Sequence, residues 1–137
     1  GALFGEAVVI MNEALKRDFR YSIKQHGGML AKGRLQGLQF ATLFTGNLYF
    51  DIAQHAIDEA MRIKAALQAK GIGFLIDSST NQQFPIFSNT QIATLSEHFM
   101  LSLWQRIDEK HTAMRICTSW ATKTESTDEL IRAIENL

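Results

Sequence analysis

The longest regular pattern of apolar positions predicts an amphipathic helix over residues 47–70. Apolar residues recur there every three or four positions, a spacing that places them on one face of a helix. They are Ile52, Ala56, Ala60, Ile63 and Leu67. Asn47 is expected to cap the first turn, and Gly71 is expected to end the helix. The pattern therefore predicts one long helix that packs against the protein along one side.

The residues before this helix predict a strand and two further helices. Residues 2–10 are mostly apolar, which is typical of a strand buried on both faces. Asn12 is expected to cap a first helix, whose apolar stripe is Leu15, Phe19 and Ile23. A lone strand has no sheet of its own, so this half of the chain is expected to belong to something larger.

A second helix is predicted over about residues 29–44. Gly33 and Gly37 lie four positions apart inside it and share one face. Glycine is unfavourable in a helix interior. The pair therefore suggests that another backbone packs closely against this helix.

After Gly71, short apolar runs replace the helical spacing. Strands are predicted over residues 72–76, 83–87, 100–107 and 112–120. Pro85 cannot donate to a β-ladder, which places its strand at an edge or a bulge. Asn89 is expected to cap a short helix, and the last helix is expected to begin with a capping box of Ser126 and Glu129. The predicted order is β-β-α-β-β-α, a small sheet with helices on one face.

The strand over residues 112–120 holds one arginine in an otherwise apolar run. Alternation places Met114 and Ile116 on one face and Arg115 on the other. Burying an unpaired guanidinium is costly, so Arg115 is expected to meet an anion. Its forked donors match a carboxylate. The residues alone leave two partners open: the carboxylate of a small substrate, and a nearby Asp or Glu in a structural ion pair.

Composition limits the remaining classes. Lys plus Arg and Asp plus Glu are 14 each, so the net charge indicates neither nucleic-acid nor membrane binding. The single cysteine, Cys117, excludes an internal disulfide and favours a reducing, cytoplasmic setting. Its apolar strand predicts a core residue rather than a nucleophile. The histidines lack metal-ligand spacing, so no metal site is predicted.

One stretch of the neutral chain is locally basic. Between Lys16 and Arg34 the only acid is Asp18. This basic face has two interpretations from the residues alone, a solvated helix surface or a binding site for phosphate. A free-standing α/β module that binds nucleotide or nucleic-acid phosphate is therefore an alternative function, although no exposed aromatic residues are expected to be interleaved with the basic ones.

Four blocks of sequence together resemble successive motifs of one enzyme family. The blocks are residues 1–9, 23–35, 80–84 and 115–122. In this order they resemble the threonine aldolase and aromatic amino acid β-eliminating lyase family, whose members use pyridoxal phosphate and have the aspartate aminotransferase-like fold. The resemblance implies an α/β fold that corresponds to the C-terminal part of a family member. Residues 1–70 would be the end of the large cofactor-binding domain plus connecting helices, and residues 71–137 the small C-terminal α/β domain.

The resemblance also implies roles for particular residues. Arg115 matches the arginine that holds the substrate α-carboxylate. Lys24 and Arg34 match the basic segment that reaches toward the cofactor phosphate, with Lys32 an equally close candidate for the second position. The turn at residues 81–82 is expected to be framework. The family's Schiff-base lysine precedes the motif that opens this chain, so no catalytic residue is expected here.

The implied activity is that of an aldehyde-lyase. Such an enzyme cleaves the carbon–carbon bond of a β-hydroxy-α-amino acid to give glycine and an aldehyde. The chain is expected to be a fragment that by itself neither binds pyridoxal phosphate nor catalyses the reaction. The expected partners are the amino acid substrate and further copies of the parent in a dimer or tetramer, with no nucleic acid and no membrane.

Overall fold

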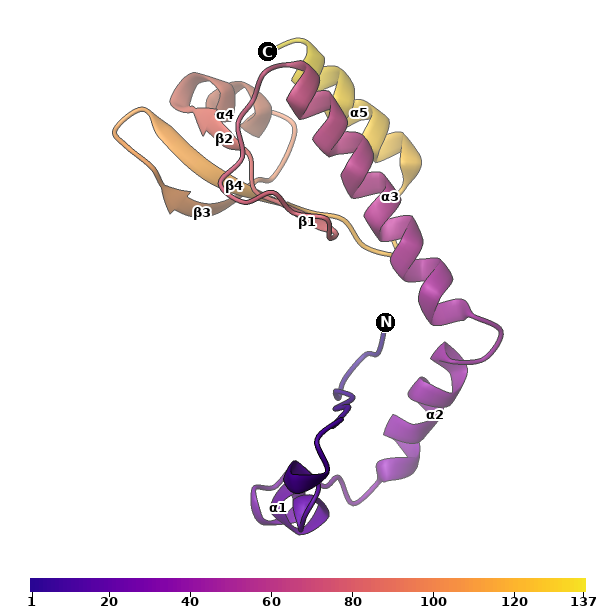
Figure 1. The fold of residues 1–137 in the computed structure, drawn as a ribbon. Helices are drawn as coiled ribbons and strands as arrows, with labels where there is room; N and C mark the ends of the chain where they lie inside the picture. Colours follow the sequence, from indigo (N-terminus) through magenta and orange to yellow (C-terminus); the bar gives the residue numbers. More distant parts are fainter. The chain divides into compact units, whose positions relative to one another are not determined.

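The computed structural model describes residues 1–137 and divides them into two compact units, Gly1–Tyr49 and Phe50–Leu137. Helix α3 (Leu48–Ala69) begins at the end of the first unit and lies mostly in the second (Figure 1). None of the helices combines the length and the apolar character needed to cross a membrane. The predicted assignment of residues 1–70 and 71–137 to two domains of a larger enzyme stays a prediction.

In the first unit, the helix predicted from Asn12 forms as two short pieces. The Asn12 side chain accepts a hydrogen bond from the Ala14 N–H at 2.9 Å, so the predicted cap is present. It begins a 3₁₀ turn, η1 (Glu13–Leu15), and α1 (Phe19–Gln25) follows separately. Asp18 between them has a φ of 55°, a left-handed conformation that interrupts a right-handed helix.

The strand predicted over residues 2–10 does not form. A strand needs a neighbour for its N–H and C=O groups, and the first unit contains no other strand. Part of the segment is tied to a helix instead, since Gln39 Oε1 accepts hydrogen bonds from the N–H groups of Leu3 (2.6 Å) and Phe4 (3.4 Å). Val9 is 82% exposed, so the apolar run is not buried in this unit.

Helix α2 (Gly33–Leu43) is shorter than predicted, and its glycine face is open. No heavy atom outside the helix backbone lies within 4 Å of where a Cβ would stand at Gly33 or Gly37. The expectation that a second backbone packs against these glycines is therefore wrong for this unit.

Helix α3 confirms the long helix predicted from the apolar stripe. Ala56, Ala60, Ile63 and Leu67 are buried, whereas Ile52 is half-buried. Gly71 ends the helix with a φ of 77°, and the Ile72 N–H closes the last turn on the Leu67 carbonyl at 3.0 Å. This is the glycine-terminated geometry that the sequence predicts.

The second unit contains a four-stranded antiparallel sheet. Strand β4 (His111–Cys117) pairs with β1 (Gln82–Gln83), β2 (Ile86–Ser88) and β3 (Ser102–Arg106). With α4 (Asn89–Ser96) and α5 (Thr124–Glu135), the order is the predicted β-β-α-β-β-α.

The first two strands of that order nevertheless differ from the prediction. The strand expected over residues 72–76 is reduced to one bridge, between Phe74 and Pro85. The strand expected over residues 83–87 is divided into β1 and β2 at residues 84–85. Pro85 lacks the N–H that an unbroken ladder would use, which explains the division.

Two helix starts also differ from the prediction. Ser88, rather than Asn89, caps α4, in a reciprocal capping box with Gln91. Helix α5 begins at Thr124, so Ser126 lies inside the helix and forms no capping box. The hydrophobic core lies between the sheet and helices α3, α4 and α5, which cover one face as predicted (Figure 1). Its buried members are Ile63, Leu67, Ile72, Phe87, Leu95, Met114, Ile116, Leu130 and Ile134.

Candidate functional site

Arg115 lies on the central strand of the sheet, on the face opposite the core. Its neighbours Met114 and Ile116 are core residues, which confirms the alternation expected from the sequence. Ser102 of β3 pairs with it directly. The residue is half-buried, so its side chain is neither enclosed in the core nor free in solvent.

Two aromatic rings accompany Arg115 on this face. The Arg115 guanidinium carbon lies over the Trp104 ring, 5.4 Å from its centroid. The Trp104 ring is in turn 5.0 Å from the Phe84 ring, at an interplanar angle of 58°. No pattern in the sequence predicted this trio. Its residues come from separate segments that only strand pairing brings together.

No acidic residue of the chain pairs with Arg115. Its guanidinium makes neither an ion pair nor a hydrogen bond to protein, and its Nε is buried without an acceptor. The structural ion pair that the sequence left open is therefore absent. A buried donor without an acceptor costs about 1–3 kcal/mol. The terminal N–H groups of the guanidinium, which are not buried and have no protein acceptor, are available to an anion from outside the chain.

The end of β4 is held to α3 by a small hydrogen-bond network. Thr118 Oγ1 donates to the Ala56 carbonyl at 2.5 Å, and Asn81 Nδ2 donates to the Thr118 carbonyl at 2.7 Å. The His55 ring contacts the Thr122 carbonyl at 2.8 Å. Asn81 thus makes the contacts expected of a framework turn. Thr118 and His55 were not predicted, although Thr118 falls in phase with the core face of its strand.

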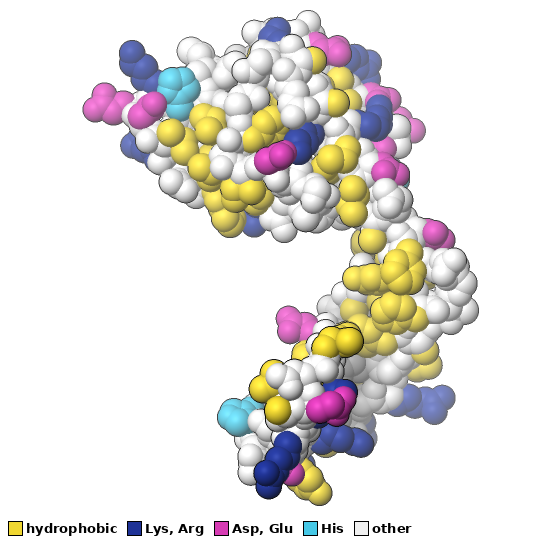
Figure 2. Space-filling view, viewed as in Figure 1, with side chains coloured by type: hydrophobic (Ala, Val, Ile, Leu, Met, Phe, Trp, Pro, Cys, Tyr) yellow, Lys and Arg dark blue, Asp and Glu magenta, His cyan; other side chains and the backbone are white.

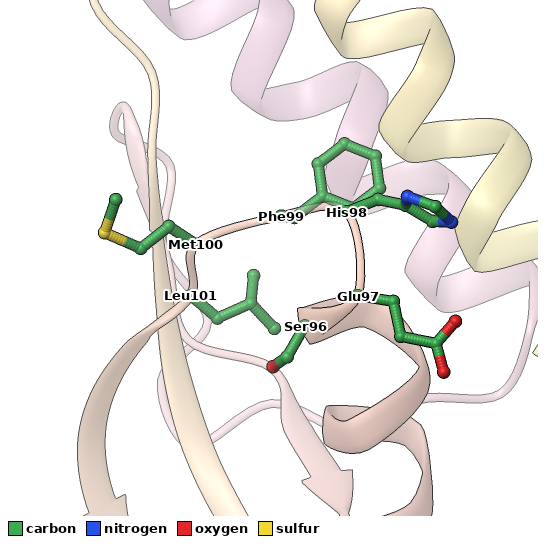
Figure 3. Close-up of a pocket in the computed structure, with 6 residues that line it drawn as sticks. All are labelled: Ser96, Glu97, His98, Phe99, Met100 and Leu101. Atoms are coloured by element: carbon green, nitrogen blue, oxygen red, sulfur yellow. The ribbon is translucent and has the colours of Figure 1, made fainter.

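Cys117 is exposed, so the prediction of a core cysteine is wrong. Cys117 shares the Arg115 face of β4, away from the core, and the strand ends there. Cys117 is one of the residues that line a hollow of about 350 Å³, together with Thr118 and Thr127. A second hollow, of about 410 Å³, lies at the turn between α4 and β3 (Figure 3). Neither hollow is lined by a lysine or an arginine, so neither offers a cation for a carboxylate.

Lys24 and Arg34 lie in the first unit, whereas Arg115 lies in the second. Lys24 is in the last turn of α1, and Arg34 is in the first turn of α2. Both are exposed and form no ion pair within the chain. Two other basic residues of the stretch are paired, Lys16 with Glu13 at 2.5 Å and Arg17 with Asp18 at 3.6 Å. Figure 2 shows Lys and Arg side chains on the surface of this unit among apolar ones.

Ion pairs elsewhere in the second unit fix its helices and turns. Arg62 of α3 pairs with Glu59 and with Asp128 of α5, and the Asp128 hydrogen bond raises the pKa of Arg62. Lys64 donates to Asp77 at 2.5 Å, which lowers the pKa of that carboxyl. These contacts are structural, since they join neighbouring elements and do not involve Arg115.

Comparison with known proteins gives a consistent result. No protein-family model matches the chain. Low specificity L-threonine aldolase from Pseudomonas aeruginosa is 29% identical over 139 residues, which cover 98% of this chain and 38% of that protein. The solved structure of Leishmania major threonine aldolase superposes with a TM-score of 0.85 at 38% identity, over 93% of this chain and 37% of that one.

A more distant structure shares the fold alone. Sphingomonas wittichii serine palmitoyltransferase superposes with a TM-score of 0.50 at 11% identity, over 61% of this chain and 23% of that one. The chain therefore spans less than half the length of each of these three proteins. The matches confirm the predicted α/β fold class and the resemblance carried by the four sequence blocks: the chain is similar over nearly its whole length to part of the threonine aldolases, with the architecture of the C-terminal domain of an aspartate aminotransferase-like fold.

Proposed function

We propose that the chain is the substrate-carboxylate-binding part of a pyridoxal-phosphate-dependent lyase that cleaves a β-hydroxy-α-amino acid to glycine and an aldehyde. The observation that carries this proposal is the state of Arg115. Its guanidinium has no acidic partner, and its Nε is buried without an acceptor. The similarity to two threonine aldolases supplies the substrate class. The guanidinium has no anionic partner within the chain, and the α-carboxylate of an amino acid substrate would be such a partner.

In this account Arg115 orients the substrate and breaks no bond itself. Two parallel N–H···O bonds from a guanidinium fix both the position and the plane of a carboxylate. Fixing the carboxylate restricts rotation about the bond to Cα, so the Cα–Cβ bond is held in one direction. Orientation of this kind can account for a large part of an enzymatic barrier reduction. The loss of Arg115 should therefore affect both substrate affinity and turnover.

The chain supplies only part of what pyridoxal phosphate requires. Lys24 and Arg34, exposed and without ion pairs, have the charge that a phosphate group needs. No lysine in the chain is identified as a Schiff-base residue, since Lys64 and Lys70 make structural contacts and none matches the family position. The cofactor, when bound, supplies an electron sink for cleavage. We therefore propose that the chain is inactive alone and acts within a longer polypeptide.

The proposed partners follow from the same reasoning. The chain covers only 38% and 37% of the lengths of the two threonine aldolases. In an enzyme of that length, residues outside the matched part can supply what this chain lacks for binding pyridoxal phosphate. Large apolar side chains of the first unit are exposed, among them Leu3, Val9 and Met11. We propose that the rest of the longer polypeptide and a further copy in an oligomer cover them.

The test is a cleavage assay with the longer protein that contains this chain. Release of acetaldehyde from L-threonine should require pyridoxal phosphate and should be absent for residues 1–137 alone. Arg115→Ala should lower kcat/KM by about 10-fold or more, as expected for losing a charged hydrogen bond. The cofactor absorbance should stay near normal, because Arg115 is assigned to the substrate. Unchanged steady-state constants in Arg115→Ala would overturn the assignment.

A further inference from the structure

Trp104 reaches the face of Arg115 through a β-bulge. In the β3–β4 ladder, Leu103 pairs with Met114 and Gln105 pairs with Ala113, so Trp104 is the extra residue between them. A bulge bends its strand, changes the direction of a side chain, and occurs frequently beside functional sites. A regular ladder would need no extra residue at this position. The irregularity is located where an aromatic side chain meets the guanidinium.

The Trp104 ring is supported from a second side by a buried residue. Phe84 is 8% exposed, and its ring centroid lies 5.0 Å from that of Trp104. The Phe84 backbone is fixed as well, since its carbonyl accepts the Leu75 N–H at 2.9 Å. Trp104 itself is 46% exposed, so burial alone does not explain a residue of this size here. The anchored Phe84 ring restricts the orientations open to the indole.

The contact leaves the donors of Arg115 available. A cation–π contact joins the charge of the guanidinium to the face of the indole ring, and a tryptophan side chain offers no acceptor atom to its N–H groups. Trp104 can therefore hold the Arg115 side chain without competing with a carboxylate for its donors. The structure agrees with this division, because Arg115 touches the ring but none of its side-chain donors has a protein acceptor.

We propose that Trp104 is a positioning residue, which holds Arg115 in the conformation that receives the substrate carboxylate. This inference rests on the proposed role of Arg115. Ordering a flexible side chain is one of the costs of binding, and a side chain that is ordered beforehand avoids it. Loss of the aromatic face should therefore weaken binding of the amino acid roughly 3- to 10-fold. The chemistry after binding should change less.

The experiment compares Trp104→Leu with Trp104→Phe in the longer holoenzyme. Both variants keep an apolar side chain, but only phenylalanine keeps an aromatic face. The KM for L-threonine should rise roughly 3- to 10-fold in Trp104→Leu, with a smaller change in kcat, and should return to within about 3-fold of wild type in Trp104→Phe. Leu103→Ala is the matched control on the same strand, and it should leave both constants unchanged.

A second readout follows the guanidinium directly. The ¹⁵N spectrum of residues 1–137 should show the Arg115 Nε–H displaced by the ring current of Trp104, with assignment from Arg115→Lys. Trp104→Leu should remove that displacement, and Trp104→Phe should keep part of it. If Trp104 had only a structural role, Trp104→Leu would lower the stability of the protein but would not selectively shift the Arg115 Nε resonance.

The outcomes separate this inference from the proposed function. If Trp104→Leu has a wild-type KM while Arg115→Ala has a lowered kcat/KM, the role proposed for Trp104 is overturned and the role of Arg115 is supported. Normal kinetics in both variants overturn both proposals. If Trp104→Leu does not fold, Trp104→Phe still decides, because a KM more than about 10-fold above wild type in a folded protein that keeps an aromatic face contradicts the inference.

Discussion

Replacing Arg115 by methionine should make the second unit more stable. The buried Nε without an acceptor costs about 1–3 kcal/mol in the wild-type chain, and methionine removes it. The change forfeits a cation–π contact with Trp104, which contributes about 0.5–1 kcal/mol at a partly exposed site. A thioether against the same ring recovers about 0.3–1.5 kcal/mol. Together these ranges give a net stabilisation of about 0.3–4 kcal/mol, centred near 2 kcal/mol, the sign expected when a residue is kept for binding.

Urea denaturation measures this difference. Both tryptophans of the chain, Trp104 and Trp120, lie in the second unit, so their fluorescence reports on its unfolding. A change of about 2 kcal/mol should raise the midpoint by roughly 1 M urea. Arg106→Met is the matched control, because Arg106 is an exposed arginine on the neighbouring strand and should change stability by less than about 0.5 kcal/mol.

The opposite sign would refute the reasoning. If Arg115→Met lowers the free energy of unfolding by more than about 1 kcal/mol while Arg106→Met does not, then Arg115 contributes to the fold through contacts of its own. An unpaired Arg115 that is kept for an anionic ligand would then be contradicted.

Two further predictions concern the stability of the second unit. Leu67→Ala should cost about 2–5 kcal/mol, because Leu67 is fully buried in the core beneath the sheet; a loss below about 1 kcal/mol in urea denaturation would contradict the packing described. The pKa of Asp77 is lowered by the hydrogen bond from Lys64, so the unfolded chain binds a proton there more readily than the folded one. That contribution is present above about pH 4 and is lost as the pH falls through the lowered pKa. Asp77→Asn should therefore reduce the fall in urea midpoint between roughly pH 6 and pH 3, and an unaltered pH profile would show that the pair contributes nothing.

Local patterns predicted the helices of this chain better than its strands. The apolar stripe of α3 and the left-handed Gly71 that ends it depend on residues close in sequence, and both were predicted correctly. The strand expected over residues 2–10 depends on a partner strand that the first unit does not contain, so apolar character alone gave the wrong answer. The break at Asp18 was also missed, since an aspartate within an apolar stripe carries no visible signal of a positive φ.

The candidate site was predicted in part. The alternation around Arg115 placed the guanidinium on the correct face, because a two-residue period depends on the strand alone. Its aromatic neighbours depend on the register between β3 and β4 and on a bulge within it, neither of which a single sequence specifies. The exposure of Cys117 was missed for a related reason, since the strand ends at that residue, on the face away from the core.

The central claim, that Arg115 binds a substrate carboxylate, is tested most directly by removing each partner in turn. The measurement is kcat/KM for L-threonine and for L-threoninamide, with the wild-type longer enzyme and with Arg115→Ala. The wild-type enzyme should prefer the carboxylate by about 10- to 100-fold, as expected for a charge-assisted hydrogen-bonded pair. In Arg115→Ala the preference should collapse to within about 3-fold. An equal preference in both enzymes would contradict the claim.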